Sequence, residues 1–342
     1  MPKYSIIVPV FKREDEIKEL LDSLALLTTQ NFEIIIVDGS PADDLIAVNT
    51  YVNSQLPDLA YQRLYSKGLG ISDSRNLGAD HAKGEYLIFM DSDVIVPKDY
   101  FDELDHALER FGYDAFGGPD AAHESFSAIQ KAISFSMTSM LTTGGIRGKE
   151  GHVGKFKPRG FNMGMKAEIF KVLGGYNALL PVGEDMDLSA RIVAEGYKTG
   201  LVSRAFVYHK RRVSISKFYK QVFRFGAARV MLSQMHRDEL KVTHLFPLFF
   251  VIYLLGGIVS LWCPEPLVRI WPISIGVYFL LLYRGAAIES GSVKVGLLSV
   301  PVTITQFAGY AIGFLKNGMA VWILRKPNGI FSKKEGEPDS PI

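Results

Sequence analysis

Two aspartates separated by one residue follow a short apolar run of the chain. The run from Tyr86 to Met90 has the length of a buried strand, and Asp91 and Asp93 come directly after it. In an extended chain, side chains two residues apart point to the same side, so both carboxylates can bind one hard cation such as Mg²⁺ or Mn²⁺. The pair therefore indicates a metal site that would also hold a substrate phosphate. A polar turn after a strand is the alternative.

The elements that must position this pair are strands and helices that alternate along the first 90 residues. We expect strands at 5–10, 32–37, 61–65 and 86–90, and helices at 14–27, 43–55 and 72–81. Such alternation predicts an α/β fold with a mainly parallel sheet and right-handed crossovers. Because Asp38 ends the second strand, it should lie at the same edge of the sheet as the aspartate pair, where open α/β sheets bind their ligands.

The bulk composition argues against a nucleic-acid-binding protein and against a disulfide-rich one. A formal net charge of +2 over 342 residues gives no reason to expect a nucleic-acid partner. The single cysteine, Cys263, rules out an internal disulfide framework. The apolar run within residues 1–10 is too short for an export signal and is typical of a first strand.

Beyond residue 242 the apolar runs become long enough for a membrane. They cover 245–262, 270–283 and 295–315, with a basic amphipathic helix expected before them over 214–237. A buried helical core is the alternative. We therefore expect a catalytic domain (1–212), an interfacial helix region (213–241), membrane-embedded segments (242–324) and a polar tail (325–342).

The basic residues around these runs indicate an orientation. Lys and Arg before the first run place the catalytic domain on the cytoplasmic side of the cell (inner) membrane, in a multi-pass protein. The tail is also basic, at Arg325 and Lys326, and prefers the same side, which three full spans would not allow. The third run is diluted by Pro301, Thr303, Thr305 and Gln306, so we expect that run to be re-entrant, interfacial or broken.

Several short motifs, in this order along the chain, resemble one known family. They are Ser5 to Glu14 with Pro9 and Phe11, Val37 to Ser40, Gly68 to Gly78 with Arg75-Asn76, Asp91 to Asp93, and Gly183 to Leu188. Together they are similar to the inverting family 2 glycosyltransferases with the GT-A fold, over about residues 3–240. The second motif has one aspartate where that family usually has two. Gly117-Gly-Pro, Gly144-Gly-Ile-Arg-Gly and Phe223-Arg-Phe-Gly further resemble membrane-anchored members that build exopolysaccharides of the succinoglycan type.

The resemblance implies a nucleotide-sugar donor, a UDP- or GDP-sugar, bound by the first half of the chain. The loop of Pro9 and Phe11 would contact the base, with Asp38 accepting its N–H. Asp91 would face the ribose or donor sugar, and Asp93 would bind the metal directly. Arg75 is expected either to contact phosphate or to clamp these carboxylates in a salt bridge, two roles that do not exclude each other.

The resemblance also implies a general base. Asp185 would take the proton from an acceptor hydroxyl, and the neighbouring Glu184 would hold the acceptor or share the role. The alternative is that both are only favourable acids in the first turn of a helix over 186–195.

Three further groups extend this hypothesis. His209 ends a late strand and would complete the metal shell, as in some relatives; an ordinary surface histidine is the alternative. The Gly- and Lys-rich segment 144–160, with Lys155 and Arg159, has the composition of a lid over phosphates, or of a solvated loop. Gln221 and Arg224 resemble the Gln-x-x-Arg-Trp motif that processive synthases use near the acceptor, with Phe225 in place of Trp.

The leading hypothesis is a membrane-bound transferase that adds a single sugar to a lipid-linked or saccharide acceptor in the synthesis of a cell-surface polysaccharide or glycolipid. Its partners would be the nucleotide sugar, that acceptor and membrane lipids, with no nucleic acid. An enzyme alternative is a polyprenyl-phosphate glycosyltransferase. A non-enzymatic alternative is a membrane assembly subunit that retains only the fold. Paired aspartates alone also suit a nucleotidyltransferase, but the Glu184-Asp185 segment argues against it.

Overall fold

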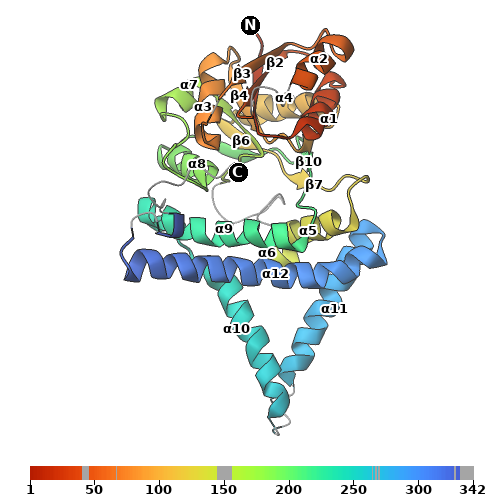
Figure 1. Cartoon of the computed structure of the whole chain (residues 1–342), viewed down its shortest axis with the longest axis vertical. Helices are drawn as coiled ribbons and strands as arrows, with labels where there is room; N and C mark the ends of the chain where they lie inside the picture. Colours follow the sequence, from red (N-terminus) through yellow and green to blue (C-terminus); the bar gives the residue numbers. More distant parts are fainter. Residues whose placement is uncertain are drawn as a thin grey trace. The chain divides into compact units, whose positions relative to one another are not determined.

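The computed structural model describes residues 1–40, 46–66, 68–144, 156–263, 265, 268, 270–326 and 329–331. Within these residues the chain forms two compact units. The first contains the described residues of 1–123 and 148–210, and the second those of 124–147 and 211–332. Figure 1 labels helices of both units and many of the strands of the first.

The first unit is built on a seven-stranded sheet in the order β3-β2-β1-β4-β8-β6-β9. Its strands are β1 Tyr4–Val10, β2 Phe32–Asp38, β3 Tyr61–Tyr65, β4 Tyr86–Met90, β6 Ala115–Gly117, β8 Asn162–Lys166 and β9 Thr199–Leu201. The pairs among β1 to β4 and between β6 and β9 are parallel, whereas β8 runs antiparallel to both of its neighbours. The predicted α/β fold with a mainly parallel sheet is confirmed.

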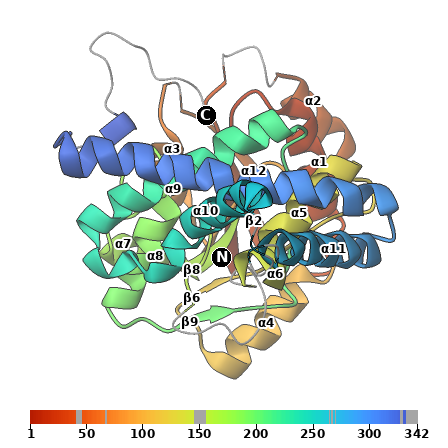
Figure 2. The ribbon, with the colours of Figure 1, turned by 90° about the horizontal axis from the view of Figure 1, so that it is seen from below.

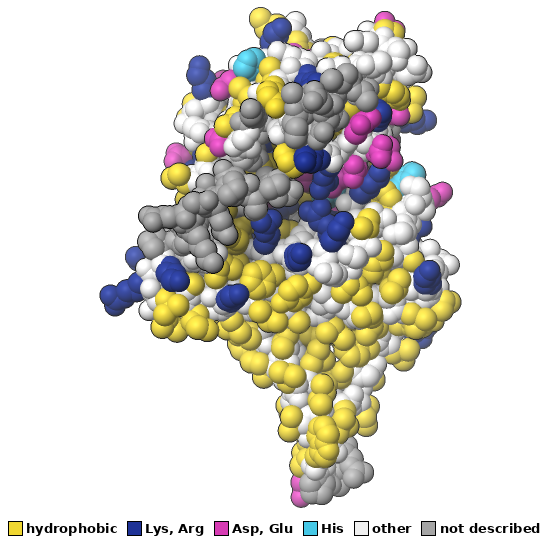
Figure 3. All heavy atoms as spheres, in the orientation of Figure 1, with side chains coloured by type: hydrophobic (Ala, Val, Ile, Leu, Met, Phe, Trp, Pro, Cys, Tyr) yellow, Lys and Arg dark blue, Asp and Glu magenta, His cyan; other side chains and the backbone are white. Residues whose placement is uncertain are grey.

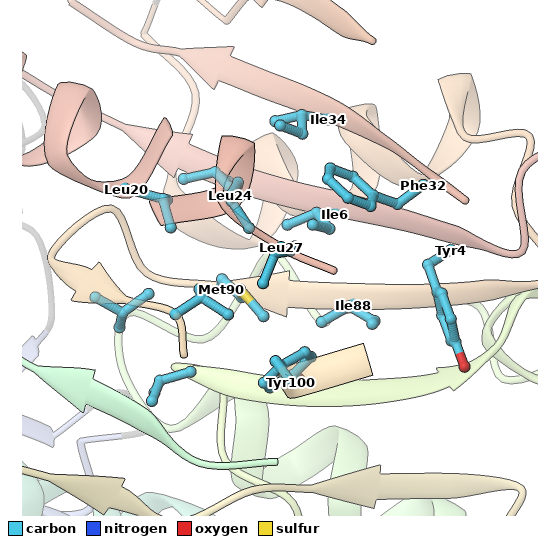
Figure 4. Close-up of a cluster of buried hydrophobic side chains, with 14 of the residues drawn as sticks. Tyr4, Ile6, Leu20, Leu24, Leu27, Phe32, Ile34, Ile88, Met90 and Tyr100 are labelled. Atoms are coloured by element: carbon cyan, nitrogen blue, oxygen red, sulfur yellow. The ribbon is translucent and has the colours of Figure 1, made fainter. Parts of the chain in front are cut away.

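Helices cover both faces of this sheet, as Figure 1 shows. On one face lie α1 Glu14–Ala25, α2 Ile46–Gln55 and α4 Tyr100–Phe111, and on the other lie α3 Ile71–His81, α7 Ala167–Val172 and α8 Glu184–Ala194. Alternate residues of the strands supply the two cores. Figure 4 shows the first core, in which Ile6, Ile34 and Ile88 from three adjacent strands pack against Leu20 and Leu24 of α1. Burial on both faces explains the nearly continuous apolar runs of β1, β2 and β4.

A small second sheet brings a late segment of the chain beside the aspartate pair. It consists of β5 Val94–Ile95, β10 Val207–His209 and β7 Asp120–Ala121, in that order. Strand β10 runs antiparallel to β5, with His209 opposite Val94. A histidine more than a hundred residues away thereby lies next to Asp93.

The second unit is helical. It contains α5 Ala128–Thr138, α6 Met140–Thr143, α9 Ile215–Met235, α10 Phe246–Val259, α11 Ile270–Ser290 and α12 Val293–Gly318. Helix α9 coincides with the basic amphipathic helix expected from the sequence. Among the described residues, three segments are long and apolar enough to cross a membrane: Val242–Trp262, Ile270–Ser290 and Val293–Ile323. On the face drawn in Figure 3, hydrophobic side chains cover the surface of this helical part.

The third of these segments differs from the other two in its packing. Figures 1 and 2 show α12 side by side with α9. Helices α10 and α11 extend away from this pair. Half of the most apolar stretch of Val293–Ile323, which contains α12, is buried inside the protein, against 17% and 11% for those of Val242–Trp262 and Ile270–Ser290. Two of the polar residues that dilute the sequence of α12, Thr303 and Gln306, lie within hydrogen-bonding distance of Ser136 of α5. These polar residues therefore interrupt the apolar sequence of α12 because they face α5 inside the protein.

Glycines allow α9 and α12 to approach closely. A Cβ added at Gly226 would lie 2.0 Å from the carbonyl oxygen of Tyr310, and one at Gly313 would lie 2.0 Å from that of Phe223. These distances are far below van der Waals contact, so the helix axes must separate if a side chain is introduced.

We expect Gly226→Ala to destabilise the second unit by about 1–3 kcal/mol, because a methyl group overpacks the contact between α9 and α12. The matched control is Gly276→Ala in α11, where an added Cβ meets nothing within 4 Å and should be neutral or slightly stabilising. All three tryptophans, Trp262, Trp271 and Trp322, belong to this unit. Thermal unfolding in detergent, followed by tryptophan fluorescence, measures the effect; equal melting temperatures for the two variants would contradict it.

Candidate active site

The aspartate pair lies at the carboxyl end of β4, between the two neighbouring sheets. Asp93 is buried, and Asp91 is partly exposed. The Nε2 atom of His209 is 3.2 Å from Oδ1 of Asp93 and 4.0 Å from Oδ2 of Asp91. The amide of Lys210 donates a hydrogen bond to the carbonyl of Asp93, which fixes β10 at this position. The structure thus brings together the three residues that the sequence suggested as metal ligands.

These three residues fit a small divalent cation. One ligand atom from each lies within 4.8 Å of the others, as expected when several atoms surround one ion. Oδ1 of Asp93 is buried and lies 3.2 Å from Nε2 of His209, which is itself a candidate ligand. Burial opposes ionisation of Asp93, but His209 and Arg13 outweigh it and hold the pKa of this carboxyl well below its usual range. Two carboxylates and an imidazole suit Mn²⁺ or Mg²⁺.

Arg13 reaches the pair from the loop between β1 and α1. Its Nη1 donates to Oδ2 of Asp93, across 80 residues of sequence. The preceding residue, Lys12, has φ +53°, a left-handed conformation that is uncommon outside glycine, and its amide donates to Oγ of Ser40. The turn at Lys12 therefore directs Arg13 toward the aspartates, which places a basic side chain at the predicted metal site.

Arg75 links the pair to the second acidic motif. Its side chain is 2% exposed; Nη2 donates to Asp91 at 3.0 Å, and Nη1 donates to Glu184 at 2.7 Å. The guanidinium carbon lies 5.2 Å from the ring centre of Tyr176, a cation–π distance. The salt bridge predicted for Arg75 is present at Asp91, whereas its contact with phosphate stays a prediction.

The second acidic motif begins helix α8. Gly183 precedes the helix with φ +85°, so a residue with a side chain would be strained at this position. Burial raises the pKa of Glu184, although Arg75 opposes this effect, and the charge of Asp185 adds to it. Asp185 is less buried, and its Oδ2 accepts a hydrogen bond from the amide of Gly160 at 3.1 Å. Of the two carboxylates, Asp185 is the more accessible and Glu184 is the one clamped by arginine.

Asp38 is fully buried behind the first loop. Its Oδ1 accepts from the amide of Ser40 at 2.8 Å, and its Oδ2 accepts two hydrogen bonds from Arg63 of β3. Asp38 does lie at the carboxyl edge of the sheet with the aspartate pair, as the parallel register requires. In this conformation it orders the loop, and its contact with a base stays a prediction. The half-buried Phe11 lies beside the same loop. A Cβ added at Gly39 would be 3.5 Å from its ring, so the ring packs against this glycine.

The remaining predicted residues are divided among different parts of the chain. Lys155 lies outside the described residues. Arg159 donates to the sulfur of Met186, and Pro158 accepts from Ser189, so the described part of the predicted lid lies along α8. Pro9 pairs with Val37 in the sheet. Gln221 and Arg224 are on α9 of the second unit, and their role toward an acceptor stays a prediction.

Three residues of this site escaped the sequence analysis: Arg13, Arg63 and Tyr176. Arg13 gave a weak signal, as a basic residue directly after the first strand and before an acidic helix turn. Arg63 and Tyr176 gave none, because their partners are 25 or more residues away in the sequence.

Comparison with known proteins identifies a family domain and a similar fold. The family model "Glycosyl transferase family 2" matches residues 5–173. The chain is 24% identical over 271 residues to the succinoglycan biosynthesis protein ExoA of Rhizobium meliloti, covering 78% of this chain and 81% of that protein. It is 26% identical to an uncharacterised glycosyltransferase of Haemophilus influenzae, covering 62% and 70%. Among solved structures, it resembles the mannosyltransferase PcManGT of Pyrobaculum calidifontis in complex with GDP-Man and Mn²⁺, with a TM-score of 0.61, 16% identity, and 89% and 87% of the chains covered. This last likeness supports the fold.

Proposed function

Because the chain carries a family 2 glycosyltransferase domain, we propose that it moves a single sugar from a nucleotide-sugar donor to a lipid-linked or saccharide acceptor, with inversion at the anomeric carbon. One observation carries the proposal. Arg75 joins Asp91 to Glu184, and so links the metal cluster (Asp91, Asp93 and His209) to the motif proposed to carry the base. An inverting displacement needs a stabilised leaving group and a base within reach of the same centre.

Each group then has a distinct task. Asp91, Asp93 and His209 would hold Mg²⁺ or Mn²⁺, whose chemistry there is to neutralise charge on the departing nucleoside diphosphate. Asp185 takes the proton of the acceptor hydroxyl as that oxygen attacks the sugar from the opposite side. The buried Arg75 offsets the charges of Asp91 and Glu184, so the acidic motifs can lie close together. The nucleotide is held by the loop of Phe11, ordered by Asp38 and Arg63.

The test of this function is a donor screen. Membranes containing the protein are incubated with UDP- and GDP-sugars, with and without Mn²⁺, and release of nucleoside diphosphate is measured. Metal-dependent release from one donor is expected. No release from any donor would favour the assembly subunit, and transfer onto a polyprenyl phosphate would favour the alternative enzyme.

We further propose that the second unit anchors the protein in the inner membrane by two spans and not by three. Residues Val242–Trp262 and Ile270–Ser290 each contain 21 residues, enough for a hydrocarbon core of about 30 Å. Helix α12 instead packs one face against α9 and exposes Leu297, Ile304 and Ile312 on the other. A helix with one protein-facing and one apolar face suits the membrane interface. Two spans return the chain to the side from which it started, which agrees with the basic tail.

This topology makes a prediction about labelling. The native Cys263 lies between the two spans and should react with a membrane-impermeant maleimide added outside spheroplasts. In a Cys263→Ser background, Lys326→Cys should react only after lysis, because residue 326 is on the cytoplasmic side. Labelling of Lys326→Cys from outside would instead indicate three spans.

A further inference from the structure

The two oxygens of Asp93 have different partners. Oδ2 accepts a hydrogen bond from Nη1 of Arg13 at 2.5 Å, whereas Oδ1 faces Nε2 of His209 at 3.2 Å. The side chain of Asp93 is 11% exposed, and that of Arg13 is 29% exposed. A rigid guanidinium thus occupies one oxygen of the carboxylate, and the other oxygen is directed toward the metal cluster.

The spacing of the cluster matches a small ion bound through Oδ1 alone. With bonds of about 2.0–2.1 Å to an octahedral ion, adjacent ligand atoms lie about 3 Å apart and opposite ones about 4 Å apart. The distances from His209 Nε2 are 3.2 Å to Oδ1 of Asp93 and 4.0 Å to Oδ2 of Asp91. An ion held through Oδ1 of Asp93 does not need Oδ2 of Asp93 as a ligand. The hydrogen bond from Arg13 to that Oδ2 can therefore remain when the metal binds.

We propose that Arg13 is a positioning residue that restricts Asp93 to monodentate binding and thereby makes the site selective for Mg²⁺ and Mn²⁺ over Ca²⁺. The chemistry follows from the preferences of the ions. Ca²⁺ takes six to eight oxygens and commonly binds carboxylates through both of them, whereas Mg²⁺ requires six ligands in near-ideal octahedral geometry. A carboxylate with one oxygen held by arginine suits the second kind of ion. This inference rests on the proposed function, since it takes the cluster to be a metal site.

The test measures metal binding directly. Affinities for Mn²⁺ and for Ca²⁺ are determined by calorimetry on the purified full-length protein, for the wild type and for Arg13→Ala. The ratio of the two affinities is the informative quantity. Loss of a positive charge strengthens the binding of both divalent ions alike, so the ratio cancels that effect. We expect Arg13→Ala to shift the ratio toward Ca²⁺ by about tenfold, the range of effects seen for residues that support metal ligands.

Three controls define the outcomes. Arg13→Lys keeps a donor for Oδ2 and should shift the ratio less than Arg13→Ala. Arg204→Ala removes an arginine that is 80% exposed and pairs with Glu103, and should not shift it. Arg13→Met, which retains most of the side-chain length but has no donor for Oδ2 of Asp93, provides the same readout if the alanine variant does not fold.

The results separate two kinds of failure. If the wild-type protein binds neither ion, whether or not UDP or GDP is added, the metal site and the proposed function are both contradicted. A wild-type protein that binds Mn²⁺ while Arg13→Ala leaves the ratio unchanged would overturn only the role of Arg13. The proposal is supported if the ratio shifts toward Ca²⁺ in Arg13→Ala and keeps its wild-type value in Arg204→Ala.

Discussion

Asp93→Asn is expected to lower kcat/KM for sugar transfer by about 10³-fold or more, because stabilisation of the leaving group by a bound cation is worth several kcal/mol. The amide keeps the shape of the side chain but removes the charge that a hard cation requires. The low pKa of Asp93 means that the wild-type carboxylate is charged throughout the physiological range, so the substitution changes its state at every relevant pH. Initial rates over a titration of Mn²⁺, at saturating acceptor, provide the measurement.

The matched control for this substitution is Asp114→Asn. Asp114 also forms an ion pair in the first unit, with Lys166, but it lies outside the metal cluster. Loss of a partly exposed ion pair costs about 1 kcal/mol or less in stability, so this variant should keep its activity. A second readout is thermal: Mn²⁺ should raise the melting temperature of the wild type and of Asp114→Asn, but not that of Asp93→Asn. Near wild-type transfer by Asp93→Asn would contradict the ligand role.

Local patterns in the sequence predicted those parts of the site that are set by residues close together in the sequence. The run Tyr86 to Met90 is a strand, and the parallel register places Asp38 and Asp91 at one edge of the sheet. These features follow from strand length and from the alternation of strands with helices, which a single sequence displays. The same holds for α9, whose basic amphipathic pattern is visible in its residues alone.

Local patterns do not show which residues far apart in the sequence come into contact. His209 reaches the pair only because β10 pairs with β5, so its role stayed one of two options. Arg13 and Asp93 are 80 residues apart, and Arg75 and Glu184 are 109 apart. A surface arginine and one that ends in a buried ion pair have the same appearance in a sequence. Residues of α12 likewise gave a mixed signal, because Thr303 and Gln306 are buried by contacts with another helix and not exposed to water.

Asp185→Asn is expected to reduce transfer to a hydroxyl acceptor by about 10²–10⁴-fold, which is the usual contribution of a general base. Asparagine retains an oxygen that can accept the hydrogen bond from Gly160, so the loop beside α8 should keep its structure. Binding of the donor diphosphate should be nearly unchanged, because Asp185 is not among the proposed metal ligands. Single-turnover rates together with the affinity for nucleoside diphosphate separate the loss of chemistry from a loss of binding.

Glu184→Gln is the comparison that distinguishes the two neighbouring acids. Glu184 is buried and paired with Arg75. Glutamine keeps an oxygen that can accept from Arg75 but removes the charge of the ion pair, so it should loosen that arginine and weaken donor binding as well as the rate. A smaller loss of rate than in Asp185→Asn, accompanied by weaker diphosphate binding, is the expected pattern. The reverse pattern, with intact binding and the larger loss of rate in Glu184→Gln, would assign the base to Glu184. Only a modest loss in both variants would point to an acceptor that is already ionised, such as a polyprenyl phosphate, because such an oxygen needs no base.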